Sequence, residues 1–327
     1  MIRLFENTVV SQLQTTVKNL LGSILATGVI LFTVSCSDSD QESTEITLDP
    51  ALGQAVFTVP EDAANALVLS LRNKDEKMLS KILGADYQNI LPLGEVDGED
   101  LKNYISAWEE SNTLLPQGEH KTLIAVGEGN WTFPIPISEG ASGWYFDVDE
   151  GLERMSIRRI GRNELSAMQA VLAYYDAQME YALKDHNGNG LLEYAPKIIS
   201  TPGTQDGLYW EVESGEKPSP LGPLMADHSS AGGYHGYFYR VLHAQGESAR
   251  GGAYGYMLGG KMRAGFALIA WPEEYGKSGV MSFMVSHAGI VYEQNLGPDG
   301  AKIAEEMPSY DPGEGWLPAK EVSGPQY

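Results

Sequence analysis

A stretch of oxygen-bearing side chains in the second half of the chain has the spacing of a calcium-binding loop. We call residues 185–193, with the sequence DHNGNGLLE, the Asp185 loop. Oxygen-bearing side chains occupy positions 1, 3 and 5 of the EF-hand pattern, and glycine occupies position 6, where the chain turns sharply. Position 7 would offer a backbone carbonyl and position 9 a carboxylate. The predicted calcium ligands are Asp185, Asn187, Asn189, Leu191 and Glu193.

The sequence leaves two interpretations of the Asp185 loop open. Pro196 stands at position 12, where an EF-hand has a bidentate glutamate, so only half of the usual ligand set is present. With Asp185 and Glu193 as its only charged ligands, the loop would bind Ca²⁺ weakly, on the order of 10⁻⁴–10⁻³ M. The alternative is a metal-free Asn-Gly turn at the end of a helix, held by Asx hydrogen bonds to its own backbone.

A group of polar and aromatic side chains around His235 is a second candidate site. Tyr237 and Arg240 lie near it on a predicted strand, and such a patch suits a ligand. Packed aromatic side chains of a sheet account for the same residues. A metal held by two histidines of this strand is excluded, because His235 and His243 would lie roughly 26 Å apart at the rise of a strand.

The glycine-rich run at residues 255–261 has the spacing of a phosphate-binding P-loop. Met262, however, occupies the position at which that motif needs a magnesium-binding Ser or Thr. The residues that follow are predicted to form a strand, whereas a phosphate cradle needs a helix N-terminus. We therefore interpret the run as a hairpin and expect no nucleotide.

Other candidate catalytic or binding arrangements have weak support in the sequence. Ser278 beside Lys277 suits a polar turn better than a Ser–Lys catalytic pair, because adjacent side chains on a turn point apart. The cluster Arg158, Arg159 and Arg162 is either an anion clamp or a set of partners for nearby glutamates one helical turn away. The spacing of acidic residues in the sequence does not identify a pair of glycosidase carboxylates, since the fold sets the distance between the two groups.

The N-terminus has the features of an export signal. Basic residues precede a short apolar run at residues 20–32, whereas a membrane-spanning helix needs roughly 20 apolar residues. The run ends just before Cys36, the only cysteine, as in a bacterial lipobox. We expect residues 1–35 to be removed as a signal peptide and Cys36 to carry the lipid that anchors the protein in the cell envelope, with the periplasmic face of the outer membrane as one location. The alternative is a transmembrane anchor that ends in a buried free cysteine.

Composition restricts the classes of partner. The chain has 44 acidic and 22 basic residues and a net charge of −22. A surface this acidic repels phosphate backbones, so we expect no nucleic-acid partner. A single cysteine excludes a disulfide framework and cysteine-based zinc or iron–sulfur sites.

The hydropathy pattern predicts two α+β modules. An acidic polar tether at residues 36–56 leads to the first module, residues 57–150, in which helices precede a small antiparallel sheet. One predicted helix starts with a capping box at Thr58, a second starts at Asp75, and a third covers residues 99–112. The predicted strands cover residues 122–126, 131–137 and 144–148.

The second module, residues 151–300, combines one long helix with an antiparallel β-meander. Apolar residues that step by three or four predict the helix over residues 163–184. The predicted strands cover residues 234–243, 264–271, 279–286 and 290–295, and residues 301–327 are assigned to a C-terminal tail. A long helix followed by a meander resembles the head of a type IV pilin or pseudopilin.

Six segments of the chain carry a family resemblance, at residues 158–165, 206–210, 219–223, 234–237, 265–272 and 275–281. They resemble a bacterial family catalogued as domain of unknown function 2950. The resemblance covers nearly all of the chain after the signal peptide, and it brings no activity or catalytic residues with it. We therefore expect a lipid-anchored envelope protein that binds to a protein partner or assembles with one. Of the two classes, we favour this role over an enzymatic one. The alternative is an envelope hydrolase acting on glycan or peptide at a tyrosine-lined cleft.

Overall fold

The computed structural model describes residues 47–49, 53–85, 87, 98–212, 217–222 and 233–319. The predicted signal peptide, Cys36 and most of the predicted tether lie outside these residues. Contacts divide the chain into two compact units, Met1–Met155 and Ser156–Tyr327. Each unit combines helices with antiparallel strands, which confirms the α+β class. No helix within the described ranges is both long enough and apolar enough to cross a membrane.

The first unit is built on a five-stranded antiparallel sheet of order β3-β4-β6-β7, with β5 also paired to β4. Helices α1, α2 and α3 contribute apolar side chains to its core, where Leu67 and Leu79 are buried with Ile124 of β4. The helices are α1 Pro60–Asn73, α2 Glu76–Leu83 and α3 Gly98–Glu110. The strands are β1 Thr47–Asp49, β2 Gln54–Val56, β3 Asn112–Pro116, β4 Lys121–Val126, β5 Trp131–Thr132, β6 Ile137–Gly140 and β7 Gly143–Phe146.

The starts of α1 and α2 test two predicted caps. The capping box predicted at Thr58 is wrong: Val59 is the N-cap residue of α1 in an extended conformation without a side-chain cap bond, and Pro60 opens the helix with its fixed φ. Helix α2 starts as predicted, because the Asp75 side chain accepts a hydrogen bond from the backbone N–H of Met78 at 3.0 Å.

The strand predicted over residues 131–137 is split into β5 and β6. Pro134 and Pro136 lie between them, and neither has an N–H to donate to a ladder. The edge strand β3 replaces the end of the predicted third helix, because α3 ends at Glu110 and Asn112 already pairs with Val126.

Helix α4, Val148–Tyr181, begins well before the predicted start at Asn163. The side chain of Asp147 accepts a hydrogen bond from the Glu150 backbone N–H at 3.1 Å, and so caps the first turn. Gly151 fits a close approach within the first unit, since a Cβ there would lie 2.7 Å from a side-chain carbon of Ile135. The first residues of α4 belong to the first unit and the rest to the second.

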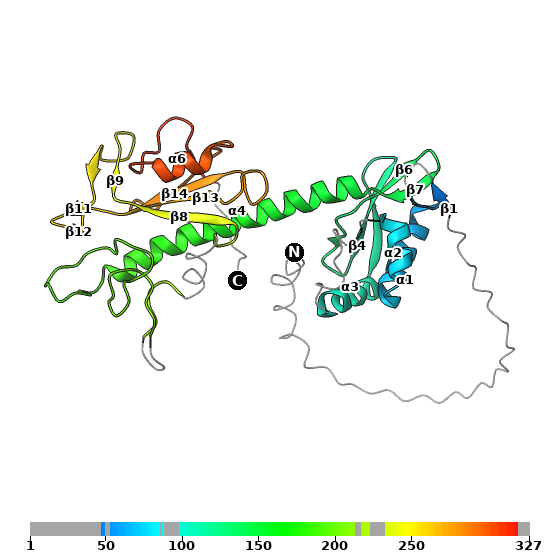
Figure 1. Ribbon diagram of the computed structural model, residues 1–327, viewed down its shortest axis with the longest axis horizontal. Helices are drawn as coiled ribbons and strands as arrows, with labels where there is room; N and C mark the ends of the chain where they lie inside the picture. Colours follow the sequence, from blue (N-terminus) through cyan, green and yellow to red (C-terminus); the bar gives the residue numbers. More distant parts are fainter. Residues whose placement is uncertain are drawn as a thin grey trace, which may run out of the picture. The chain divides into compact units, whose positions relative to one another are not determined.

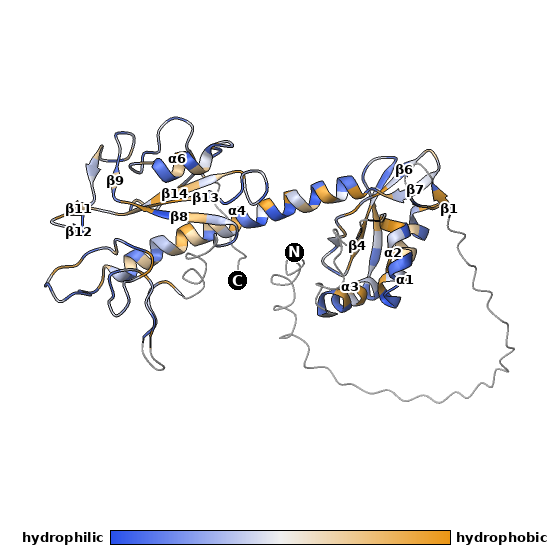
Figure 2. Ribbon diagram, in the orientation of Figure 1, coloured by the Kyte–Doolittle hydropathy of each residue, from blue (hydrophilic) through white to orange (hydrophobic). Residues whose placement is uncertain are grey.

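The second unit has a five-stranded antiparallel sheet of order β16-β15-β14-β13-β8. The sheet lies between α4 on one face and the short helix α6, Gly300–Glu306, on the other (Figure 1). Its central strands β13 and β14 are buried along their whole length and are among the most hydrophobic segments in Figure 2. The strands are β8 Tyr237–Leu242, β13 Ala267–Pro272, β14 Ser282–Ser286, β15 Val291–Gln294 and β16 Leu317–Pro318.

This arrangement agrees with the predicted long helix and meander and extends it. The turn before β15 contains Gly289 at φ 75°, whose N–H donates to the Ser286 carbonyl. Helix α6 and strand β16 lie in the segment that the sequence assigned to a tail, and β16 pairs with β15. The run at residues 255–261 forms part of a hairpin, as expected. The small strands here are β9 Ala244–Gln245, β10 Tyr254–Gly255, β11 Met257–Leu258 and β12 Lys261–Met262.

Candidate functional site

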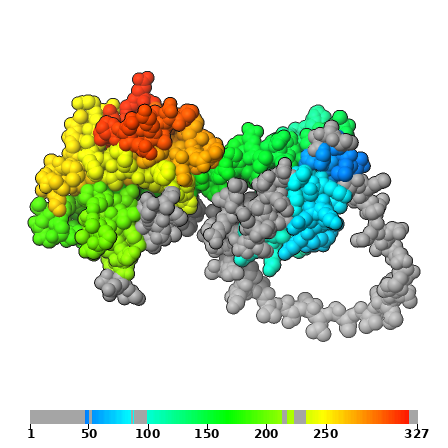
Figure 3. Space-filling view, viewed as in Figure 1, coloured from blue at the N-terminus to red at the C-terminus, as the bar shows by residue number. Residues whose placement is uncertain are grey.

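The segment between α4 and β8 carries the two features of greatest functional interest. It leaves the end of α4 at the Asp185 loop and continues largely without regular structure through the described residues 194–212 and 217–222. Figure 3 shows this segment, in light green, packed as a lobe beside the strands of the second unit, which are yellow. Bridges between Tyr194 and Met262 and between Ile199 and Tyr209 fix its path.

The Asp185 loop is closed by hydrogen bonds from its own backbone. One carboxylate oxygen of Asp185 accepts from the Gly190 N–H at 2.7 Å and the other from the Gly188 N–H at 2.8 Å. These donors, Gly190 first, lower the pKa of Asp185. The side-chain oxygens of Asn187 and Asn189 accept from backbone N–H groups two residues ahead, as in Asx turns.

Glu193 contributes a buried carboxylate to the same loop. Its side chain is 7% exposed, and Oε1 contacts the side-chain amide of Asn187. The ammonium of Lys261 lies 3.5 Å from Oε1, whereas Oε2 is buried without a hydrogen-bond partner among the residues described. Within those residues, no group of three or more His, Cys, Asp or Glu side chains is arranged to hold a metal, and the loop itself combines two carboxylates with two amides.

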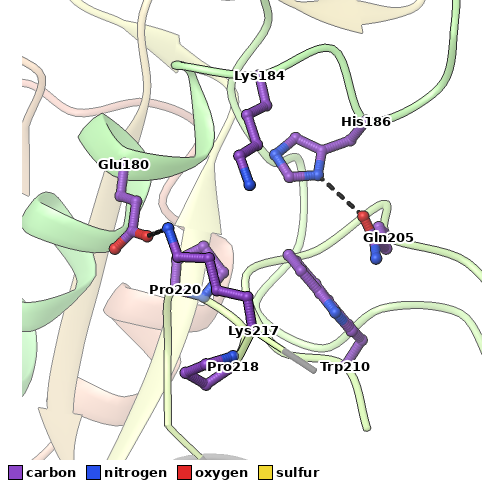
Figure 4. Close-up of a pocket in the computed structure, with 8 residues that line it drawn as sticks. All are labelled: Glu180, Lys184, His186, Gln205, Trp210, Lys217, Pro218 and Pro220. Atoms are coloured by element: carbon purple, nitrogen blue, oxygen red, sulfur yellow. Dashed lines mark hydrogen bonds and ion pairs between the residues drawn. The ribbon is translucent and has the colours of Figure 1, made fainter. Parts of the chain in front are cut away.

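A pocket of about 360 Å³ lies next to the loop, and we call it the Trp210 pocket (Figure 4). The end of α4 and the start of the Asp185 loop form one side, and the irregular segment after the loop forms the other. The lining residues are Glu180, Lys184, His186, Gln205, Trp210, Lys217, Pro218 and Pro220.

The imidazole of His186 is held firmly against the pocket. It stacks on Tyr181 with ring centroids 3.9 Å apart and an interplanar angle of 12°, and it meets the Trp210 indole edge-on at 5.5 Å. Its Nδ1 lies 3.2 Å from Gln205 Oε1 and its Nε2 lies 3.1 Å from the Tyr181 carbonyl oxygen. Burial, followed by the nearby carboxylates of Glu193 and Asp206, raises the pKa of Tyr181 to about 12. The pocket therefore has a preformed aromatic wall.

The charges in the pocket are unusual for so acidic a chain. Lys217 forms an ion pair with Glu180 at 3.0 Å, so the single carboxylate of the pocket is already neutralised. Lys184 makes no ion pair with any residue in the described ranges. Figure 4 shows its amino group directed into the pocket. The lining thus has an excess of positive charge.

A polar cluster centred on Asp206 supports the irregular wall. Asp206 accepts hydrogen bonds from the Lys197 ammonium at 2.6 Å, from the Thr201 backbone at 2.7 Å and from the Thr204 hydroxyl at 3.0 Å. Burial raises the pKa of Asp206, but these donors outweigh burial and hold the pKa well below its usual range. The cluster fixes the turn just before Trp210.

The residues of the predicted His235 patch do not share one accessible surface. Tyr237 is fully buried and donates a hydrogen bond to the Met281 carbonyl at 2.8 Å. Arg240, of opposite parity on β8, lies on the other face of the sheet and donates to the carbonyls of Ala304 and Met307 at 2.6 Å each. His235 stands in the turn before β8 at φ 52°, with its ring against Tyr234. The grouping of all three in one ligand patch is therefore corrected.

The remaining candidates have structural partners in the second unit. Arg159 donates to the Lys277 carbonyl at 3.2 Å, and Glu164 accepts from two backbone N–H groups at residues 280 and 281. Ser278 exchanges hydrogen bonds with the backbone of Glu274, and Lys277 forms an ion pair with the Glu274 side chain. These contacts hold the turn before β14 against α4.

Comparison with known proteins gives one match. The family model described as protein of unknown function, DUF2950, matches residues 54–319. No curated protein and no solved structure matches the chain. What the protein does must therefore be argued from its own residues.

Proposed function

We propose that this chain, which belongs to the DUF2950 family of proteins of unknown function, is a lipid-anchored binding protein of the cell envelope. Cys36 would carry the anchor, after removal of residues 1–35. The Trp210 pocket would bind an acidic segment of a partner protein.

The observation that carries this proposal is an unpaired lysine directed into an aromatic pocket of a strongly acidic protein. The ammonium of Lys184 has no ion-pair partner in the described part of the chain, although acids outnumber bases by two to one. A carboxylate of a ligand would complete that ion pair. A flat or apolar side chain next to it would pack on Trp210, which has the residue type that most often dominates binding free energy at interfaces.

A polypeptide suits this lining better than a sugar. Pro218 and Pro220 stand beside Trp210, and aromatic side chains in shallow pockets are typical of sites that take extended peptides. A sugar needs many polar groups to replace its hydration, whereas Glu180 and Lys217 already satisfy each other.

A hydrolase gains no support from the Trp210 pocket. Glycoside hydrolysis needs two carboxylates roughly 5–10 Å apart, one of them able to donate a proton. The pocket has one carboxylate, Glu180, which lies in an ion pair with Lys217. The alternative of a hydrolase at a tyrosine-lined cleft gains no support from Tyr237 of the predicted His235 patch, because that side chain is buried.

Assembly through α4 is a second candidate that a specific observation favours. Leu165, Leu172 and Met179 are 38%, 40% and 44% exposed, and their spacing of seven residues places them on one side of the helix. Such a stripe suits packing against another helix, as the predicted resemblance to pilins would require. This candidate and the pocket use different surfaces, so they can be tested separately.

Binding at the pocket can be tested with peptides. A random decapeptide phage library panned on the detergent-solubilised full chain should be enriched in sequences with Asp or Glu beside an aromatic or proline residue. Trp210→Ala should weaken the selected peptides about 30-fold, because truncation of a central interface tryptophan typically costs about 2 kcal/mol or more. Lys184→Glu should also weaken them, since it places like charges together. Fluorescence polarisation measures each affinity.

The matched control is Trp316→Ala, which removes a tryptophan of the same unit outside the pocket lining. Unchanged binding in both Trp210→Ala and Lys184→Glu would refute the pocket as the binding site.

A further inference from the structure

We propose that the Asp185 loop is a Ca²⁺ site in which Glu193 supplies a buried ligand. The loop residue His186 lines the Trp210 pocket, but none of the proposed ligands does, and the proposal does not rest on the function proposed for the pocket. The ligands would be side-chain oxygens of Asp185, Asn187, Asn189 and Glu193, together with the backbone carbonyl of Leu191.

The observation that points to a cation is a buried oxygen of the Glu193 carboxylate that has no partner among the described residues. The Glu193 side chain is 7% exposed, and its Oε2 accepts no hydrogen bond from those residues. A buried acceptor without a partner is costly, and more costly when it carries charge. A bound cation would remove this cost.

The Glu193 carboxylate lies against the rest of the loop. Its Oε1 contacts the side-chain amide of Asn187, which is the loop residue at position 3. The two carboxylates of the proposed site therefore approach the same turn from its two ends, with the amide of Asn187 between them. Ca²⁺ prefers such oxygen sets of mixed charge, with six to eight ligands and tolerance of irregular geometry.

The hydrogen bonds seen within the loop are compatible with this role. Asp185 accepts N–H donors from four residues, which fixes its carboxylate at the centre of the turn before any ion arrives. Gly188 and Gly190, at φ 72° and 80°, allow the backbone to wrap around that carboxylate. The turn is thus organised in advance around a negative charge.

Lys261 is the group that would compete with the ion. Its ammonium lies 3.5 Å from Glu193 Oε1, but its side chain is 46% exposed and can move into solvent. An exposed ion pair of this kind contributes little to stability, so Ca²⁺ can displace it. Replacement of Lys261 by methionine should therefore strengthen Ca²⁺ binding about two- to fivefold.

The experiment uses the full chain in detergent, with CaCl₂ titrated by isothermal calorimetry and followed in thermal melts. With a dissociation constant on the order of 10⁻⁴–10⁻³ M, about 2 mM Ca²⁺ should raise the melting temperature by roughly 1–7 °C relative to chelator. Mg²⁺ at the same concentration should give a smaller shift, because it demands stricter geometry and dehydrates reluctantly.

Variants locate the ion. Glu193→Gln and Asp185→Asn should abolish the Ca²⁺-dependent shift, whereas Glu273→Gln, which removes an exposed carboxylate elsewhere in the unit, should keep it. Lys261→Met retains every proposed ligand, so its stronger binding tests the site without removing a loop contact. Trp210→Ala should leave Ca²⁺ binding unchanged, which separates this proposal from that for the pocket.

Three results would overturn the proposal. They are the absence of heat and of a melting shift in the wild type, an equal shift in Glu193→Gln and Asp185→Asn, and an unchanged affinity in Lys261→Met. The first would leave the loop as a turn held by Asx bonds alone. The others would place the ion away from Glu193.

Discussion

Replacement of Cys36 by serine should abolish lipid labelling of the protein in its host. Cys36 is the only cysteine of the chain, so the proposed thioether-linked diacylglyceryl group has no second site. Metabolic labelling with an alkyne fatty acid, followed by a click reaction and gel fluorescence, should give a strong band for wild type and background for Cys36→Ser. Lipidation is the appropriate readout because an uncleaved apolar run at residues 20–32 could itself retain the variant in the membrane fraction.

The control for this experiment is Ser37→Ala, which changes the neighbouring residue and keeps the thiol. It should be labelled like wild type. Equal labelling of wild type and Cys36→Ser would contradict the lipid anchor at Cys36. If both show only background labelling, the alternative of a transmembrane anchor is favoured.

Replacement of Gln178 by leucine should strongly destabilise the second unit. Gln178 is fully buried in α4; its amide nitrogen donates to the Ala195 carbonyl at 2.8 Å, and its amide oxygen accepts from the Ala195 N–H at 2.9 Å. Leucine leaves both backbone groups of a buried residue without partners, at about 1–3 kcal/mol each. We expect a loss of about 3–5 kcal/mol, which corresponds to a melting temperature lower by roughly 6–20 °C. Circular dichroism melts measure it.

A matched substitution on the same helix separates this effect from helix propensity. Gln169→Leu makes the same change at an exposed position of α4 and should alter stability by no more than about 0.5 kcal/mol. Similar melting temperatures for Gln178→Leu and wild type would show that the segment after the Asp185 loop is not anchored through this side chain.

The regular elements were predictable where local signals agreed with tertiary packing. Asp75 begins α2 through a side-chain cap bond with the Met78 N–H, and this signal depends on neighbouring residues alone. The start of α4 has comparable signals, because Asp147 is a good N-cap and acidic residues follow it in the first turn. These signals did not decide the prediction, because the apolar pattern of the preceding strand continues to Val148. Val148 is the first residue of α4, and an apolar residue at that position fits the end of a strand equally well.

The Trp210 pocket was not predictable in the same way. Its lining comes from the end of α4, the Asp185 loop and three parts of an irregular segment, and no periodicity connects them. The only local hint was a tryptophan, Trp210, followed by the two prolines Pro218 and Pro220. The ion pair of Lys217 with Glu180, which leaves Lys184 as the unpaired cation, depends on a contact across 37 positions of sequence.

The His235 patch failed as a prediction for a related reason. Sequence proximity on a strand does not imply a shared surface, because Tyr237 and Arg240 have opposite parity. Tyr237 is buried and donates to the Met281 carbonyl, whereas Arg240 donates to a carbonyl of α6. The residue types suited a ligand, but the side chains of Tyr237 and Arg240 already donate to backbone carbonyls in the fold. In the Asp185 loop, by contrast, the motif predicted the local turn, and the burial of Glu193 emerged only from the contact with Lys261 and Asn187.

Site-specific photo-crosslinking in the native host tests the central claim most directly. A photoreactive amino acid at position 218, on the rim of the Trp210 pocket, is compared with the same residue at position 172 on α4 and at position 302 on α6. We expect position 218 to give a discrete adduct with another protein, position 302 to give none, and Lys184→Glu to abolish the adduct. No adduct at position 218, or an adduct that persists with Lys184→Glu, would contradict binding at the pocket. An adduct at position 172 alone would favour assembly through α4.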